Sequence, residues 1–236
     1  ITPLLQFDRP NKLEVDAAKH SANDSVNKAE RLADYWVFGG IYRPVYLEAV
    51  PAQFIERVAI DARHDGTLTL EVFAGSVKGA DAVEAQVTSL EGKPEGELFS
   101  QSLAGSNVTL RTRLANPRPW TAETPNLYLV EVRLMQATNV LHRVKQRFGF
   151  RTMEVRDGEG LFVNDRKVIL KGAIRDSFWP DSGRCLSEAV HRLDLAALKE
   201  MNLNAVRTSP GPPDSAFLDL CDELGFYVLD ELADRK

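Results

Sequence analysis

The stretch Asn204-Ala205-Val206-Arg207-Thr208-Ser209 decides the fold of this chain, because a short apolar run ends there in polar residues. The same pattern precedes it in Lys171-Gly172-Ala173-Ile174-Arg175 and follows it in Tyr227-Val228-Leu229-Asp230-Glu231. Helix-forming residues separate the three runs. Strands that carry polar side chains at their carboxyl ends, with helices between them, are typical of a β/α barrel. The sequence therefore predicts the first part of such a barrel at residues 151–236, ending well short of closure.

The elements around these strands have recognisable boundaries. The run Val168–Ile174 is almost entirely apolar, which predicts a strand covered on both faces. Ser187 can cap a following helix. The apolar stripe predicted for this helix consists of Val190, Leu193, Ala197, Leu198 and Met201.

A second helix is expected to begin at Pro212-Pro213-Asp214 and to stop at Gly225. We expect its buried face to contain Phe217, Leu218, Cys221 and Leu224. Short loops between strands and helices predict parallel strands with right-handed crossovers. A hairpin turning at Asn164-Asp165 is expected just before this region.

Residues 51–150 show short alternating strands separated by turns. Such spacing over about 100 residues favours an antiparallel sandwich of the immunoglobulin-like type. The strands predicted here are Phe54–Ala62, Thr67–Phe73, Ala82–Val87, Val108–Leu114, Leu127–Leu134 and Leu141–Phe148.

Residues 1–50 begin polar and irregular. The segment Asn23–Lys28 is rich in turn-forming residues, which favours a surface loop. The alternation from Ile41 to Ala49 predicts a strand, and Gly39-Gly40 supplies a tight bend before it. The chain opens at Ile1-Thr2-Pro3 without an initiator Met, so we expect a cut end, and its compartment cannot be predicted.

Composition excludes some classes of protein. The chain is 44% hydrophobic and 27% charged, and its net charge of −5 argues against a nucleic-acid partner. No apolar run approaches the roughly 18 residues of a membrane span. Cys185, Cys221 and the scattered histidines lack metal-ligand spacing, so neither a metal nor another cofactor is expected. Cys221 is interpreted as core packing.

The chain resembles the family 2 glycoside hydrolases, the group that includes β-galactosidases and β-glucuronidases. The stretches that carry this resemblance occur in family order: Asp34–Leu47, Pro119–Tyr128, Gly149–Thr152, Leu170–Gly172, Pro180–Arg184, Asn204–Ser209 and Asp222–Gly225. The resemblance implies a mainly β chain with a C-terminal α/β part. Residues 1–50 would end a jelly-roll domain, residues 51–150 would form the immunoglobulin-like β-sandwich, and residues 151–236 would begin a TIM barrel.

The resemblance also implies a retaining exo-β-glycosidase acting on a carbohydrate substrate. Retention requires two carboxyl groups about 5–5.5 Å apart. In the family both are glutamates on later barrel strands, and the first usually follows an Asn. No Asn-Glu pair occurs in this chain. We therefore expect that this chain contains no catalytic residue and is inactive alone.

Part of a substrate pocket remains as a prediction, because active sites in this fold lie at the carboxyl ends of the strands. Arg207 matches a family arginine that orients the nucleophilic carboxylate, although a structural ion pair with Asp230 or Glu231 would also explain it. Asp176 and Pro210-Gly211 stand where the family usually has histidine and His-Tyr. The candidate pocket residues are Arg207, Asp176, Trp179, Ser209, Asp230 and Glu231.

Two alternatives stay open. One is a non-catalytic carbohydrate-binding or scaffold fragment, consistent with the β-rich first 150 residues. The other is an ester hydrolase with Ser177 or Ser209 as nucleophile and His191 as base, although no Gly-x-Ser-x-Gly elbow is present. Open barrel strands also predict self-association of the chain.

Overall fold

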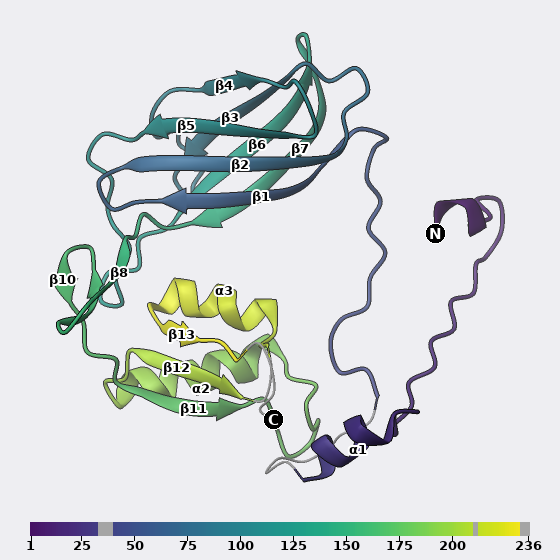
Figure 1. The fold of residues 1–236 in the computed structure, drawn as a ribbon, viewed down its shortest axis with the longest axis vertical. Coiled ribbons are helices and arrows are strands. Elements are labelled where there is room, and N and C mark those ends of the chain that lie inside the picture. The colour runs from purple at the N-terminus through teal and green to yellow at the C-terminus, as the bar shows by residue number, and fades with distance from the viewer. Residues whose placement is uncertain (33–39, 210–211, 232–236) are drawn as a thin grey trace.

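The computed structural model describes residues 1–32, 40–209 and 212–231. It contains a large two-sheet part, a small hairpin sheet and a C-terminal α/β part (Figure 1). The fold is mainly β with its helices concentrated near the carboxyl end, as predicted.

The two-sheet part consists of two antiparallel sheets that share one core. The first has the strand order β1-β2-β5 and the second the order β4-β3-β6-β7. The core contains alternate residues of each strand, as in Leu68, Leu70 and Val72 of β2. The strands are β1 (Phe54–Ala62), β2 (Thr67–Ser76), β3 (Ala82–Thr88), β4 (Phe99–Ser102), β5 (Asn107–Arg113), β6 (Tyr128–Gln136) and β7 (Asn139–Phe148).

Each strand predicted for this region is confirmed, with shifts of up to three residues at its ends. The short strand β4 was missed because Phe99-Ser100-Gln101-Ser102 carries no apolar alternation. The immunoglobulin-like type of the sandwich and the domain boundaries at residues 50 and 150 stay predictions.

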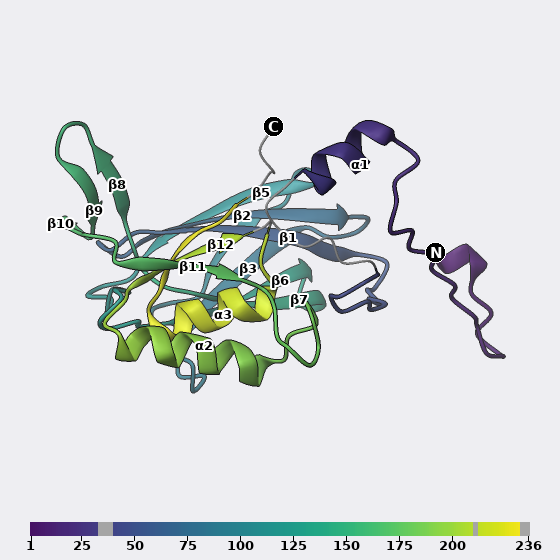
Figure 2. The same cartoon turned by 90° about the horizontal axis from the view of Figure 1, so that it is seen from below.

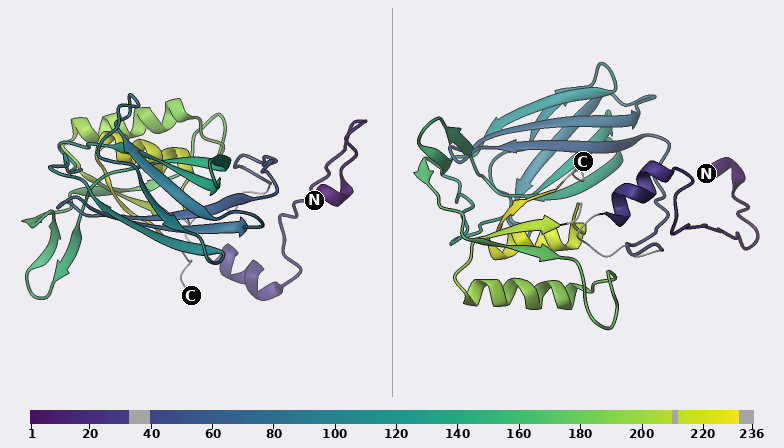
Figure 3. Two further views of the ribbon diagram at one scale, coloured as in Figure 1. Left: turned by 90° about the horizontal axis from the view of Figure 1, so that it is seen from above. Right: turned by 60° about the horizontal axis from the view of Figure 1, so that its bottom comes forward.

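The hairpin sheet connects the two larger parts and projects away from both (Figure 3). Its strands are β8 (Met153–Arg156), β9 (Gly160–Val163) and β10 (Arg166–Lys167). The predicted turn is confirmed, since Asn164 and Asp165 have φ angles of 50° and 63°. Two adjacent residues with positive φ form the tight hairpin turn that fits the natural twist of strands.

The α/β part alternates strands and helices, with its three strands parallel and in chain order. Ser187 and Asp214 cap the two helices by accepting the backbone N–H of Val190 and of Ala216. Gly225 ends the second helix at a φ of 73°. The elements are β11 (Gly172–Asp176), α2 (Glu188–Glu200), β12 (Ala205–Ser209), α3 (Ser215–Leu224) and β13 (Tyr227–Leu229).

Two predictions for the first barrel strand are wrong. The strand begins only at Gly172, whereas Val168 was expected to start it. Its two faces are not both covered, because Ile174 is 64% exposed. Helices α2 and α3 pack on one face of the sheet (Figure 2), and within the described residues nothing covers Ile174 on the other.

The predicted stripe of α2 is wrong at most of its positions, although Leu198 packs against the core beside Leu195 and Phe217. Leu193 and Met201 are exposed, and the helix instead buries His191 and Leu195. Both sets of residues have helical spacing. The set that packs contains His191, a polar residue, so it was not recognised as the buried face. For α3 the prediction largely holds, since Phe217 and Cys221 are buried together with Leu220.

The N-terminal segment differs from expectation. Besides a short 3-10 helix at Thr2–Leu4, residues Asp24–Arg31 form helix α1 where a loop was predicted. The Asn23 side chain caps α1 by accepting the Ser25 N–H, so the polar residues were helix-start signals. The strand expected from Ile41 to Ala49 does not form, because no described strand lies beside it to complete its hydrogen bonds. The expected bend at Gly39-Gly40 lies partly outside the described residues.

Trp120 holds the three parts together. Its indole Nε1–H donates to the Asp222 carbonyl in α3 at 2.8 Å, and its ring meets Tyr227 edge to face at 5.5 Å. The Arg151 guanidinium lies 4.6 Å from the centre of the indole ring. Asn164 of the hairpin turn donates to the Trp120 carbonyl at 3.0 Å.

Further polar contacts surround this junction. Arg147 of β7 donates to the Glu223 carboxylate at 2.6 Å and to the Asp219 carbonyl at 2.7 Å, which ties α3 to the two-sheet part. The Lys199 ammonium of α2 donates to the carbonyls of Ala122 and Gly225. The α/β part is therefore attached to the two-sheet part through packing around Trp120 and through the hydrogen bonds of Arg147 and Lys199.

The end of α3 at this junction leads to a test. A Cβ on Gly225 would lie 2.3 Å from the Ala122 carbonyl oxygen, in addition to the strain of a positive φ. Gly92 has a φ of 86° but no atom within 4 Å of an added Cβ. Strain alone costs about 1–3 kcal/mol. Gly225→Ala should therefore lower the free energy of unfolding clearly more than Gly92→Ala, measured by urea denaturation. Equal losses would contradict the close approach at Ala122.

Candidate functional site

The three strands β11, β12 and β13 are parallel, so their carboxyl ends lie together at one end of the sheet. The register pairs Asp176 with Ser209, Ile174 with Arg207, and Arg207 with Leu229. Paired residues of parallel strands point to the same face. Arg207 is therefore on the face opposite α2 and α3, beside the exposed Ile174.

Arg207 forms an ion pair on this face. Its Nη2 lies 3.4 Å from Oε1 of Glu231, and the two side chains are 37% and 17% exposed. The other carboxylate oxygen of Glu231 is buried without a hydrogen-bond partner among the described residues. The structural ion pair considered for Arg207 is thus present, and it involves Glu231 rather than Asp230.

Thr208 organises the end of β13 from the neighbouring strand. Its hydroxyl donates to the Asp230 carboxylate at 3.1 Å and accepts the Glu231 N–H at 3.4 Å. The side chain is buried with 4% of its surface exposed. Sequence reasoning missed Thr208, because a threonine within a strand indicates only packing.

The remaining candidates lie nearby but are not joined to this group. Asp176 is exposed at the end of β11. Trp179 follows in a turn closed by backbone hydrogen bonds with Gly183, and no described contact links its ring to Arg207. Pro210-Gly211 lie outside the described residues. The structure thus brings together Arg207, Thr208, Asp230 and Glu231.

A second polar cluster lies on the helix face of the same sheet. Arg175, which is 8% exposed, donates to the Asp194 carboxylate at 2.9 Å and to His191 Nδ1 at 3.0 Å. Its guanidinium also lies 4.4 Å from the centre of the Phe217 ring. Burial, and then the Arg175 charge, lower the pKa of His191.

The contact with Arg175 assigns the state of His191. A guanidinium can only donate, so Nδ1 of His191 must accept and the ring is neutral with its proton on Nε2. A serine-hydrolase histidine instead donates from this position to a carboxylate. Ser177 Oγ lies 3.5 Å from Nη1 of the same arginine. The geometry therefore argues against a Ser177–His191 pair.

The N-terminal segment contacts this region through two side chains that sequence reasoning did not single out as site residues. Arg43 donates to the Pro212 carbonyl, just before the cap of α3. The Arg184 guanidinium lies 4.5 Å from the centre of the Tyr42 ring. Tyr42, Arg43 and Arg184 border a cavity of about 10 Å³, which His191 and Asp214 also line. That volume suits a single water molecule.

Among the described residues, no group of three or more His, Cys, Asp or Glu side chains could hold a metal ion. No helix within the same residues is long and apolar enough to cross a membrane.

Two family models match the chain. One, described as "Glycosyl hydrolases family 2", matches residues 53–151. The other, described as "Glycosyl hydrolases family 2, TIM barrel domain", matches residues 153–235. Together they cover the two-sheet part, the hairpin sheet and the α/β part.

Individual proteins agree with this match. A beta-galactosidase of Lactobacillus delbrueckii subsp. bulgaricus is 34% identical over 94% of this chain, which spans 22% of that protein. A crystal structure of a beta-glycosidase from Bacteroides vulgatus superposes with a TM-score of 0.73 and 25% identity, covering 84% of this chain and 26% of its own. A b-glucuronidase from Ruminococcus gnavus shares the fold, with a TM-score of 0.67 and 24% identity over 78% of this chain and 30% of its own.

The buried histidine predicts a pH dependence of stability. The unfolded chain binds a proton at His191 with a pKa near 6.5, whereas the folded protein binds it less readily. Stability should therefore fall as the pH drops below about 6.5, until the pH passes the lowered pKa. In His191→Gln the amide oxygen can still accept from Arg175, but it does not titrate.

Urea denaturation from pH 7 to pH 5 measures the effect. The slope of unfolding free energy against pH should be lower in His191→Gln than in the unmodified protein, by up to about 1.4 kcal/mol per pH unit. All carboxylates contribute alike to both proteins. Identical slopes would mean that His191 is not held neutral by the fold.

Proposed function

The chain belongs to glycosyl hydrolase family 2, and on this premise we propose that it forms part of a retaining exo-β-glycosidase acting on β-galactosides or related sugars. It spans less than a third of the length of the relatives named above. The observation that carries the proposal is the ion-paired Arg207 on the open face of the barrel sheet, two residues before its strand ends at Ser209. Substrate pockets in barrels lie at this end of the strands.

The proposed mechanism divides the work between this chain and later barrel strands. The two carboxyl groups that act as nucleophile and acid/base would come from glutamates outside this chain. Arg207 would orient the nucleophilic carboxylate through charge-assisted hydrogen bonds. Its Nη2 lies 3.4 Å from the Glu231 carboxylate at the end of the neighbouring strand. This chain would thus supply positioning groups rather than catalytic ones.

The other candidates would bind the sugar. Asp176, Ser209 and Asp230 offer hydroxyl and carboxylate groups at the ends of three adjacent strands, which suit the hydroxyl groups of a saccharide. Thr208 would hold Asp230 in place through its hydroxyl. Trp179 would provide an apolar wall for the sugar ring.

A second candidate function is carbohydrate binding or scaffolding without catalysis. Asp176 favours it, because the resemblance leads us to expect a histidine there. Calorimetric titration of galactosides and glucuronides distinguishes the two functions. A longer polypeptide that contains this chain and binds sugar without turnover would support the second.

Activity assays test the main proposal. With p-nitrophenyl β-galactoside or p-nitrophenyl β-glucuronide, this chain alone should release no nitrophenol above buffer. A longer polypeptide in which the chain continues into a strand ending in Asn-Glu should hydrolyse one of them with retention. In that polypeptide Arg207→Ala should lower kcat by about 100-fold, since removing one orienting donor typically costs that much. The matched control Arg166→Ala changes an exposed arginine of the hairpin sheet.

Two results would decide against the proposal. Retaining turnover by this chain alone would show that the catalytic carboxylates lie within it. Absence of turnover in the longer polypeptide would remove the glycosidase assignment and leave the binding alternative.

We also propose that the open sheet face mediates self-association of the isolated chain. Ile174 and Leu229 are 64% and 46% exposed on that face. Light scattering should therefore give a mass that rises with protein concentration, and Ile174→Lys should reduce the rise. Val155→Lys is the control, since Val155 is 84% exposed on the separate hairpin sheet. A constant monomer mass in the unmodified chain would contradict this proposal.

A further inference from the structure

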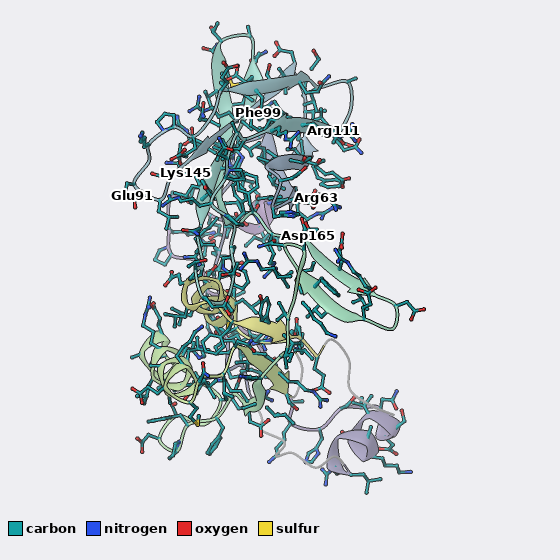
Figure 4. All side chains as sticks on the ribbon, turned by 90° about the vertical axis from the view of Figure 1, so that its left-hand side faces the viewer. Arg63, Glu91, Phe99, Arg111, Lys145 and Asp165 are labelled. Atoms are coloured by element: carbon teal, nitrogen blue, oxygen red, sulfur yellow. The ribbon has the colours of Figure 1, made fainter. Side chains whose placement is uncertain are left out.

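The two-sheet part contains a groove of about 590 Å³ at its boundary with the hairpin sheet. Pockets for small molecules typically measure about 300–1,000 Å³. The turn between β1 and β2 forms one wall, and the connection from β5 to β6 forms the other. Its lining includes His64, Asp65, Arg113, Asn116, Pro117 and Pro119. Figure 4 shows this boundary, with Arg63 of the β1–β2 turn close to Asp165 of the hairpin.

Both walls are held by hydrogen bonds within the protein. The Asp65 carboxylate accepts the N–H and the hydroxyl of Thr67, at 2.9 and 3.1 Å. His64 lies between Thr152, whose hydroxyl is 2.9 Å from Nδ1, and the Asp165 carboxylate, 3.0 Å from Nε2. The Leu114 N–H donates to the Gly66 carbonyl and joins the two walls. A ligand would therefore meet a groove that is already shaped, which reduces the ordering cost of binding.

The charges of the groove are balanced. Hydrogen bonds from the backbone and side chain of Thr67 lower the pKa of Asp65, so this carboxylate is ionised at neutral pH. Arg113 compensates it, with Nη2 3.8 Å from the carboxylate and Nε donating to the Asp65 carbonyl. An acid and a base that pair across the two walls favour neither an anionic nor a cationic ligand.

Free hydrogen-bonding capacity remains within the groove. Within the described residues nothing hydrogen-bonds the Asn116 side chain, which offers an amide donor and a carbonyl acceptor. The Arg113 side chain is 70% exposed, and its Nη1 has no hydrogen bond to a described residue. Pro117 and Pro119 add apolar ring surface beside these groups.

From this combination we propose that the groove binds a neutral saccharide unit. Sugar hydroxyl groups can both donate and accept, which matches Asn116, Arg113 and the Asp65 carboxylate. The C–H face of a sugar ring is apolar, which matches the proline rings. This proposal goes beyond the proposed function, because the groove lies on the two-sheet part rather than at the carboxyl ends of β11–β13.

NMR titration of the ¹⁵N-labelled chain tests the proposal. Methyl β-D-galactopyranoside and cellobiose are the neutral probes, and sodium glucuronate is the charged one. We expect saturable amide shifts of Asp65, Arg113 and Asn116 with a neutral probe. Arg113→Ala and Asn116→Ala should each raise Kd at least about fivefold, because each removes a hydrogen bond to the ligand.

Arg111→Ala is the matched control and should leave Kd unchanged. Arg111 is exposed on the same strand and the same face as Arg113, two residues earlier. It does not line the groove, and Figure 4 shows it higher on the two-sheet part, away from Arg63 and Asp165. Circular dichroism confirms that each variant keeps its fold.

Each contrary outcome overturns the proposal. The first is the absence of saturable shifts at the groove. The second is a Kd for Arg113→Ala and Asn116→Ala equal to that of the unmodified chain. The third is tighter binding of glucuronate than of either neutral sugar. Shifts confined to Arg207 and Ser209 would remove the groove proposal and support the proposed pocket at the strand ends. Shifts confined to the groove would leave the glycosidase assignment to the activity assays.

Discussion

The hydrogen bond from the Trp120 indole to the Asp222 carbonyl is the contact on which the arrangement of the chain depends. The indole is 2% exposed, so its N–H requires a partner inside the protein. Asp222 belongs to the last turn of α3, whose carbonyls lack partners within the helix. One bond therefore satisfies two groups that would otherwise be buried unpaired or left to solvent. Burial lowers the pKa of Arg151 above the same ring, while Asp222 and Tyr227 oppose that shift and favour its charged form.

Features encoded by neighbouring residues could be predicted from the sequence. The alternation of β2, the caps Ser187 and Asp214, the turn at Asn164-Asp165 and the stop at Gly225 all depend on a few consecutive positions. Features that depend on distant partners could not. The buried face of α2 includes His191, whose ring accepts a hydrogen bond from Arg175 on the helix-covered face of the sheet. Residues 41–49 have the composition of a strand, but a strand forms only where another can pair with it.

The same distinction applies to the candidate site. Polar residues at strand ends were recognisable as a group, because their position follows from the alternation of strands and helices. The pairing of Arg207 with Glu231 and the role of Thr208 depend on the register between β12 and β13, which the sequence does not reveal. The family comparisons establish the class of protein, but the partners of each side chain come from the geometry alone.

The position of Trp120 also bears on the order in which the chain folds during synthesis. Trp120 and Asp222 are 102 residues apart, so at about 5–20 residues per second the indole leaves the ribosome roughly 5–20 s before its partner. The strands β1 to β7 can pair and close their core within that interval, since all of them precede Met153. The finished two-sheet part then presents the indole to α3 as soon as that helix emerges. The first-made part of the chain thus acts as an internal template for the α/β part.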